Sequence, residues 1–329
     1  MDYSQQQRAY IIAEAGINHG GDMAVAARML QAAAEAGVDA VKFQSFTAGT
    51  LTHSVLAADQ HEFFARYELS RDEHRELAAL CRARGLDFIS TPFDFGMVDL
   101  LAELGVPAFK IASCDLTNIP LIEHAARHGK PLYISTGMGD VAEARAAYQA
   151  ARAAGSPRVV LLQCTTNYPT LYPDVNLRAM QALADGVGCE VGFSDHSVGN
   201  FCCYAAVALG AAVIEKHFCL DKGAAGPDIP GSCDPAELKE LVAGVRAIEQ
   251  ALGSAEKAMR QSEREVAAIA RRSIFYARDL PAGHTLALSD FAFLRPASGM
   301  SPARVGELAG HPLTRSVHAS DAASTADVR

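Results

Sequence analysis

Polar and ionisable side chains recur in this sequence at one kind of place, directly after a short apolar run. His196 and His217 follow two runs that are neighbours in the chain, at residues 190–193 and 213–215. Two neutral imidazoles held close together form the core of a Mn²⁺, Zn²⁺ or Fe²⁺ site, and Glu14, after the run at 10–13, adds a carboxylate. The alternative for either histidine alone is a hydrogen-bonded loop residue. Taken together, the three predict a divalent-metal site.

Two lysines belong to equivalent runs. Lys42 lies in the run at 40–43 and Lys110 in the run at 108–111. Hydroxyl side chains end or follow the neighbouring runs, and they are Thr91, Ser113, Ser135 and Ser194. Two ammonium groups ringed by hydroxyls in an acidic protein favour a site for a phosphate or carboxylate. The alternative for each lysine is a carboxylate partner or a path to solvent.

The elements that must position these residues alternate regularly. Eight short β-rich runs stand at 10–13, 40–43, 87–89, 108–111, 131–134, 159–163, 190–193 and 213–215. Each is followed by a stretch with helical composition and spacing, for example 23–36, 71–84 and 142–154. Continuous apolar runs indicate strands buried on both faces, so the pattern predicts a (β/α)8 TIM barrel, with a doubly wound open sheet as the alternative. The long connection at 45–70 is typical of a functional loop.

The composition changes after Leu252. Residues 1–252 are predicted to form the barrel, and residues 253–270 a polar linker with helical character. Short apolar runs separated by turn residues then predict a compact β-rich domain over residues 271–320. The polar residues 321–329 are predicted to be a disordered tail.

Charge and hydropathy exclude several classes of protein. The net charge of −9 argues against a nucleic-acid or anionic-membrane partner. The longest apolar stretch, residues 201–214, is shorter than the roughly 18 residues that span a bilayer. Residues 1–8 are polar and do not resemble a signal peptide, and the eight cysteines show no CxxC pair. A cytoplasmic protein with reduced cysteines is therefore expected.

Several motifs in this order resemble the sialic acid (N-acetylneuraminate/nonulosonate) synthase family. They are Ile11-Ile-Ala-Glu-Ala-Gly-Ile-Asn-His-Gly20, Val41-Lys-Phe-Gln44, Ile89-Ser-Thr-Pro-Phe93, Phe109-Lys-Ile-Ala-Ser113, Ser135-Thr-Gly-Met138, Tyr168-Pro-Thr170, Gly192-Phe-Ser-Asp-His196, Glu215-Lys-His-Phe218 and Gly226-Pro-Asp228. Residues 272–274, 280–283 and 295–296 resemble the antifreeze-like (SAF) domain that the family carries at its C-terminus.

The resemblance implies a transferase of carbohydrate (sialic acid) biosynthesis. The family condenses phosphoenolpyruvate with an amino sugar such as N-acetylmannosamine, through its open-chain aldehyde, to give a nonulosonic acid and phosphate. It further implies a divalent metal, first Mn²⁺ and otherwise Mg²⁺ or Co²⁺, and a domain-swapped homodimer. Neither nucleic acid nor membrane is implied as a partner.

The resemblance also implies roles for residues of this chain. The metal ligands are His196 and His217. Phosphoenolpyruvate is expected to be bound by Lys42, Thr91, Lys110, Ser113, Ser135 and Ser194. The sugar is expected to be bound by Gln44, Tyr168, Asp228 and Arg295.

Some points stay open from the sequence. Either Glu14 or Asp115 is the general base. Ala112-Ser-Cys-Asp115 departs from the Gly-Ser-Gly-Glu that bacterial members often have, but the shorter carboxylate of Asp115 still suits acid–base work. Asn18-His19-Gly20-Gly21 departs similarly from Asn-His-Asn-Gly, so the acceptor sugar and its phosphorylation are undecided. The alternatives are another phosphoenolpyruvate-dependent aldose condensation, of the 3-deoxy-octulosonate or heptulosonate phosphate type, and a catalytically inactive sugar-binding protein.

Overall fold

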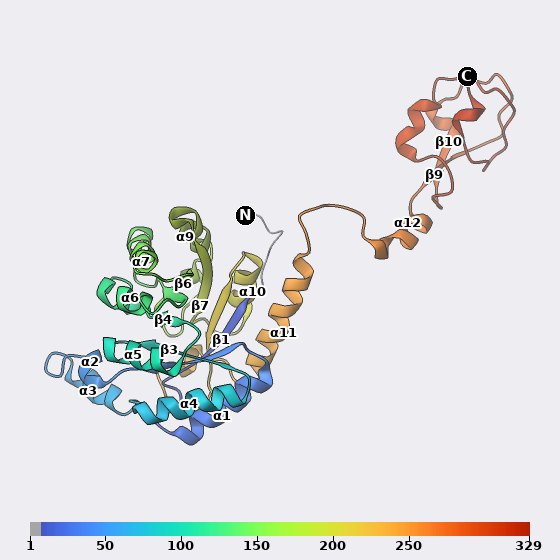
Figure 1. Ribbon diagram of the computed structural model, residues 1–329. Coiled ribbons are helices and arrows are strands. Elements are labelled where there is room, and N and C mark those ends of the chain that lie inside the picture. The colour runs from blue at the N-terminus through green and yellow to red at the C-terminus, as the bar shows by residue number, and fades with distance from the viewer. Residues whose placement is uncertain (1–7) are drawn as a thin grey trace. The chain divides into compact units, whose positions relative to one another are not determined.

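The computed structural model describes residues 8–329 and divides the chain into two compact units, Met1–Ser254 and Ala255–Arg329 (Figure 1). The first unit is built from eight parallel strands and the helices between them. The second unit is small and contains one two-stranded antiparallel sheet.

The eight strands of the first unit confirm the predicted barrel. They are β1 Tyr10–Gly16, β2 Ala40–Ser45, β3 Asp87–Pro92, β4 Phe109–Ile111, β5 Leu132–Ser135, β6 Val159–Cys164, β7 Glu190–Asp195 and β8 Val213–His217. Parallel pairing runs in the order β3-β2-β1-β8-β7-β6-β5-β4, and β3 contacts β4, so the ring is nearly closed. Most strands extend a residue or more beyond the apolar runs, so several of the predicted site residues end strands rather than begin loops.

Helices connect the strands and cover the outside of the barrel (Figure 1). Their bounds are α1 Met23–Ala36, α2 Ala48–Leu51, α3 Ala58–Ala65, α4 Arg71–Ala83, α5 Phe95–Leu104, α6 Ile119–Ala126, α7 Val141–Ala153, α8 Tyr172–Val175, α9 Ala179–Leu183, α10 Phe201–Ala208 and α11 Pro235–Leu252. Capping boxes begin α4 at Ser70 and α7 at Asp140, and each satisfies backbone N–H groups of the first turn. Helices α1 and α5 end at Gly37 and Gly105, whose positive φ angles suit glycine.

The barrel interior is layered along its axis. Side chains alternate between the two faces of a strand, so Glu14 lies on the same face as Ile12, and Lys110 on the same face as Ala108. The apolar floor consists of Ile12, Ala40, Ile89, Ala108, Tyr133, Val160, Leu162 and Val213. The next inward-facing positions, toward the C-terminal ends of the strands, are mostly polar. The strand period therefore places the charged residues directly above a dry floor.

The second unit contains the helix α12, Arg264–Ala270, and the strand β9, Ser273–Tyr276, which pairs with β10, Phe291–Leu294. Its core consists of Ile274, Tyr276, Leu280, Leu286, Phe291, Leu308, Leu313, Val317 and Ala323.

The prediction of a disordered tail at residues 321–329 is wrong. Ala323 is buried in the core of the second unit, and Val328 packs against it and bridges Leu313. Asp327 is buried, and Arg315 Nε donates to its Oδ1 at 2.8 Å. Few apolar residues are needed here, because the ion pair between buried Asp327 and the exposed Arg315, together with backbone bridges, holds the segment.

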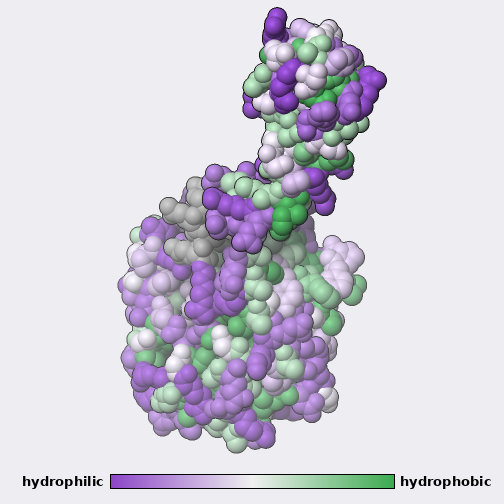
Figure 2. Space-filling view, turned by 90° about the vertical axis from the view of Figure 1, so that its right-hand side faces the viewer, coloured by the Kyte–Doolittle hydropathy of each residue, from purple (hydrophilic) through white to green (hydrophobic). Residues whose placement is uncertain are grey.

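The visible surface of the first unit is mostly hydrophilic. On the face of the first unit that Figure 2 presents, hydrophilic residues predominate and hydrophobic ones are dispersed. No helix within residues 8–329 is both long and apolar enough to cross a membrane.

Candidate active site

A cavity of about 240 Å³ opens at the C-terminal ends of the barrel strands. Inward-facing residues at the strand ends and the loops that follow them form its walls. Leu51 of α2 and Phe64 of α3 also line it. The long connection between β2 and α4, expected to be functional, thus contributes to the cavity wall.

Most of the predicted site residues meet in this cavity. Eleven of the fourteen line it: Glu14, Lys42, Gln44, Thr91, Lys110, Ser113, Ser135, Tyr168, Ser194, His196 and His217. Of the remaining three, Asp115 and Asp228 do not line it, and Arg295 belongs to the second unit. The rule that a β/α barrel gathers its polar groups at the C-terminal ends of its strands accounts for this convergence.

Lys42 lies at the centre of a buried network of ion pairs. Its Nζ lies 2.7 Å from Glu14 Oε2 and 3.8 Å from Glu215 Oε2. The same Nζ donates to Thr91 Oγ1 at 3.0 Å. Gln44 Nε2 donates to the other oxygen of Glu14, at 3.4 Å. The ammonium group is therefore held in place by carboxylates rather than reaching solvent.

Lys110, on β4, joins the same ion network through Glu215. Its Nζ lies 3.5 Å from Glu215 Oε1, which also accepts a hydrogen bond from Ser194 Oγ at 2.9 Å. The Nζ also donates to the carbonyl of Ile111, at 3.2 Å. Glu215 thus lies between the two lysines, and two cations face two carboxylates in a buried space.

The protonation of the network follows from burial and from these charges. Burial, together with repulsion by Glu215, raises the pKa of Glu14 to about 7 in spite of the Lys42 ammonium. Burial also lowers the pKa of Lys110, although Glu215 opposes the shift. Burial would raise the pKa of Glu215, but Lys110 and Lys42 outweigh it and leave that pKa below its usual value. Glu14 is therefore the carboxyl that can exchange a proton near neutral pH.

Three rings lie together beside this network. The ring centroids of His196 and His217 are 5.1 Å apart, and the ring of Tyr168 lies 4.1 Å from that of His196. His196 Nδ1 is 2.8 Å from the carbonyl oxygen of Thr165. A carbonyl only accepts, so Nδ1 donates to it, and Nε2 is the nitrogen that offers a lone pair when the ring is neutral. Burial would lower the pKa of His196, but Cys164 and the Thr165 carbonyl outweigh it and raise that pKa.

His217 has the properties of a neutral ligand. Its Nδ1 is buried and has no hydrogen-bond partner among residues 8–329, the Asp228 carboxylate lying 3.7 Å away. Burial, followed by the charges of His196 and Lys42, lowers the pKa of His217 well below its usual range. An orphaned, unprotonated imidazole beside a second imidazole with a free lone pair fits a divalent ion. Glu14 lines the same cavity, but its Oε2 is engaged by Lys42.

Hydroxyl groups line the wall near β4 and β5. Ser113 Oγ accepts from the backbone N–H of Gly137 at 3.0 Å. A Cβ at Gly137 would collide with Thr166 Oγ1 and Ser113 Oγ, so glycine suits this close approach. The hydroxyls of Ser135 and Thr166 are buried without a hydrogen-bond partner in the described chain. Buried polar atoms left without partners indicate that a ligand completes this wall.

Two predicted residues of the first unit lie outside the cavity. Asp115 ends a short 3-10 turn, Ser113–Asp115, and its Oδ1 accepts from Asn118 Nδ2 at 2.9 Å. This turn keeps the Asp115 carboxylate from the wall that Ser113 and Cys114 form. Asp228 is not a lining residue, but its Oδ2 lies 3.7 Å from His217 Nδ1, and the loop after β8 brings the same oxygen close to Gly16 beside Glu14.

Arg295 belongs to the second unit, at the end of β10. It is exposed and makes no hydrogen bond or ion pair with another residue of the range 8–329. Its predicted contact with a sugar therefore stays a prediction.

Sequence reasoning did not single out Glu215, Cys164 or Thr166, although all three line the cavity. A signal for Glu215 was present, because it is two residues from both Val213 and His217 and shares their inward face. Lys216, between Glu215 and His217, faces outward and pairs with Asp195 at 2.8 Å.

The fold and the cavity together define a β/α-barrel protein with a cation-rich, histidine-containing site at its mouth. Residues 29–257 match the NeuB family and residues 271–329 match the SAF domain. The chain belongs to the NeuB family.

Its relatives of known name extend over most of its length. It is 42% identical to the N,N'-diacetyllegionaminic acid synthase of Legionella pneumophila, over 94% of this chain and 92% of that protein. It is 36% identical to the N-acetylneuraminate-9-phosphate synthase of Mus musculus, over 92% of this chain and 85% of that protein.

Solved structures share the architecture. The N-acetylneuraminic acid synthetase of Leptospira borgpetersenii, solved with citrate, is 36% identical and has a TM-score of 0.75 over 79% of this chain and 90% of that chain. A truncated 3-deoxy-D-arabino-heptulosonate 7-phosphate synthase of Thermotoga maritima is 18% identical, with a TM-score of 0.60 over 75% of this chain and 88% of that chain, a likeness of fold alone.

Proposed function

We propose that this protein condenses phosphoenolpyruvate with an N-acetylmannosamine-like amino sugar to give a nonulosonic acid and phosphate. The observation that carries the proposal is the cavity itself, where two lysines, two buried carboxylates, a ring of hydroxyls and two histidines converge. The names of the relatives support it, because they are synthases of legionaminic acid and of N-acetylneuraminate 9-phosphate.

The phosphoenolpyruvate end of the site is assigned to the lysine side of the cavity. Lys42 and Lys110 would neutralise the phosphate and carboxylate, and Thr91, Ser113, Ser135 and Ser194 would donate hydrogen bonds to their oxygens. In the protein alone, Glu14 and Glu215 already balance the two ammonium groups. An anionic substrate therefore binds most favourably when Glu14 takes up a proton, which its pKa of about 7 permits.

The chemistry requires a new carbon–carbon bond. C3 of phosphoenolpyruvate attacks the open-chain aldehyde carbon of the sugar, and the π bond of the aldehyde breaks. The aldehyde oxygen takes the proton of Glu14 and becomes a hydroxyl, while positive charge develops at C2 of the former enol. Glu215 lies between the two lysines and stabilises that charge. Water then adds at C2, and phosphate leaves from the resulting tetrahedral centre with cleavage of its C–O bond.

A general base must remove the proton of the attacking water. Once it has given its proton to the aldehyde oxygen, Glu14 is the better placed of the two candidates, because it lines the cavity and its pKa lies near neutrality. Burial also raises the pKa of Asp115, but that carboxylate lies outside the cavity and is held by Asn118. Gln44, Tyr168 and Asp228 are assigned to the sugar.

His196 and His217 are proposed to hold a divalent ion, Mn²⁺ first and Mg²⁺ or Co²⁺ otherwise. Such an ion, when bound, would supply Lewis-acid polarisation of the aldehyde oxygen. The tautomer fixed by the Thr165 carbonyl and the orphaned Nδ1 of His217 support this assignment.

A panel of acceptors tests the function. Phosphate release from phosphoenolpyruvate is measured with Mn²⁺ and with N-acetylmannosamine, its 6-phosphate, a 2,4-diacetamido hexose, or four- and five-carbon aldose phosphates. Release with one amino sugar, and a product mass equal to both substrates plus water minus phosphate, is the expected result. Release only with the aldose phosphates would favour the heptulosonate-type alternative, and no release with any acceptor would favour a sugar-binding protein.

We further propose a homodimer in which Arg295 of one chain completes the barrel of the other. The exposed and unpaired guanidinium supports it, since its planar fork suits the acyl group of a sugar. Mixing inactive Arg295→Ala chains with inactive His217→Ala chains should restore activity in about one site in four after random subunit exchange. Exchanged mixtures that stay inactive would contradict the swapped arrangement.

A cytoplasmic location is proposed as well. All eight cysteines are free, and most of them are buried. Unpaired cysteines suit a reducing compartment. Fractionation of cells that express the protein, with phosphate-release activity as the marker, would place it in the cytoplasmic fraction if this is right.

A further inference from the structure

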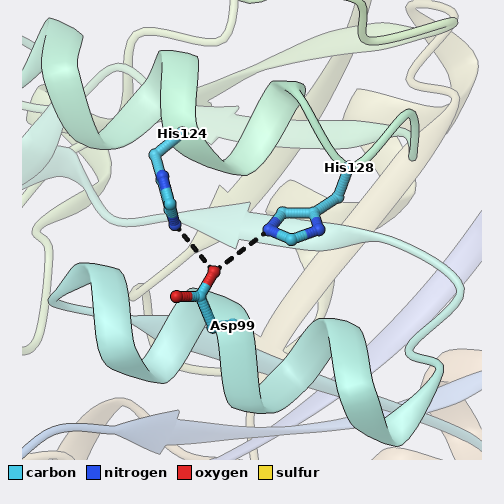
Figure 3. Close-up of side chains that lie close together, drawn as sticks. All are labelled: Asp99, His124 and His128. Carbon is cyan, nitrogen blue, oxygen red and sulfur yellow. Dashed lines mark hydrogen bonds and ion pairs between the residues drawn. The ribbon is translucent and has the colours of Figure 1, made fainter.

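A second group of histidines lies on the outside of the barrel, away from the cavity. Asp99 projects from α5, His124 from α6, and His128 from the turn that follows α6 (Figure 3). His124 Nε2 is 2.8 Å from Asp99 Oδ1, and His128 Nε2 is 3.3 Å from the same oxygen. Neither histidine nor the aspartate lines the proposed active site.

The spacing of this cluster is that of a chelating site. His124 and His128 are four residues apart, so they project from the same side of α6 and its C-terminal turn. Within residues 8–329, it is here that three His, Cys, Asp or Glu ligand atoms lie within 4.8 Å of one another. The separation of ligand atoms around a four-coordinate Zn²⁺ is ~3.4 Å, which follows from bonds of about 2.1 Å. Small rotations of these partly exposed side chains would bring their ligand atoms to the separation that Zn²⁺ requires.

The two imidazoles are held by aromatic neighbours. The ring of His124 lies 5.0 Å from that of Phe95, and the ring of His128 lies 5.8 Å from that of Phe109. Both Nε2 atoms point at one carboxylate oxygen (Figure 3). A divalent ion would take the place of the protons that now bridge these atoms, and solvent would supply its remaining ligand.

We infer that Asp99, His124 and His128 form a second metal site, for a borderline divalent ion of which Zn²⁺ is the best match. Two imidazoles and a carboxylate are donors that Zn²⁺ prefers, and the open position toward solvent completes a tetrahedron. The ion joins α5 to α6 and stabilises the barrel without touching the substrates. The competing account is a carboxylate that only accepts from two histidines and binds no metal.

The experiment measures Zn²⁺ binding to the full chain after metal removal. The His196→Ala/His217→Ala variant, which lacks the proposed cavity ligands, should still bind one equivalent of Zn²⁺ and gain thermal stability from it. Adding Asp99→Asn or His128→Ala should abolish both effects. In the wild-type chain, His128→Ala should leave phosphate release unchanged. Co²⁺ bound to the double variant should show the intense visible absorption of a tetrahedral site.

His318→Ala serves as the matched control, because His318 also lies near a surface carboxylate, 3.6 Å from Asp279, but has no second histidine beside it. It should change neither the stoichiometry nor the thermal shift. A double variant that binds no Zn²⁺, or a His128→Ala chain that retains it, would overturn the inference. Should the double variant unfold, the wild-type chain should lose one of two equivalents on His128→Ala, and no loss would overturn it equally.

Discussion

Histidines and carboxylates meet twice in this barrel, in the cavity and on its outer helices, and burial separates the two places. His217 is buried and His124 is only partly so. In the cavity, carboxylates are balanced by buried lysines and one imidazole nitrogen has no partner. On α5 and α6, the carboxylate of Asp99 accepts from both imidazoles and faces water. The same residue types therefore lie in a buried, charge-balanced environment in one place and in a solvated one in the other.

The largest expected difference between the cavity and the cluster on α5 and α6 is the effect of a histidine substitution on turnover. His196→Ala or His217→Ala should remove tight binding of Mn²⁺ and lower turnover by more than about 100-fold, because even residues that only hydrogen-bond to metal ligands are worth about 10–100-fold. His124→Ala should leave turnover unchanged. Elemental analysis and phosphate release check both, with circular dichroism to show that the barrel is folded. A His217→Ala chain that keeps its cavity metal would contradict the assignment.

The second difference is in the free energy of unfolding. Glu215→Gln leaves Lys110 buried without its carboxylate partner, and breaking a buried pair in this way costs about 3–5 kcal/mol. Glu190→Gln breaks an ion pair with Arg158 that is partly exposed, which costs below about 1 kcal/mol. Urea denaturation of both variants measures the contrast. Equal losses would show that the cavity network is not desolvated.

The strand period explains how much of the cavity was predictable. Lys42 and Thr91 face inward because they lie two residues after apolar inward-facing residues, and the barrel rule then brings them together. Glu215 obeys the same rule, but a buried charge at the end of an apolar run is not expected without knowing its two lysine partners. Asp115 lies outside the cavity wall because a single 3-10 turn redirects its side chain, and composition does not reveal such a turn.

The second unit shows the complementary limit. Its β-rich character followed from alternating apolar runs and turn residues, which are local signals. The order of residues 321–329 depends on Asp327 meeting Arg315 and Tyr276, contacts between segments distant in the chain. Tertiary pairing of this kind leaves no periodic trace in a short polar segment.

The smallest expected difference is in the pH dependence of stability. The pKa of Glu14 is about 7 in the folded chain and has its ordinary value of 4.5 in the unfolded chain. Between these two pH values, the folded chain keeps a proton on Glu14 that the unfolded chain has lost. Stability should therefore fall as the pH rises through this window. Glu14→Gln should flatten that fall, whereas Glu103→Gln, on the exposed side of α5, should not. Urea denaturation at pH 5 and pH 8 gives the comparison, and an unchanged slope in Glu14→Gln would contradict the raised pKa.

The central claim is that the cavity joins phosphoenolpyruvate to a sugar by attack of water at carbon. Running the reaction in ¹⁸O-water and weighing the released phosphate by mass spectrometry tests it directly. If water adds at C2 and the C–O bond breaks, the phosphate keeps its original oxygens and carries no label. Labelled phosphate would mean that water attacks phosphorus, and the roles assigned to Glu14 and to the two lysines would be wrong.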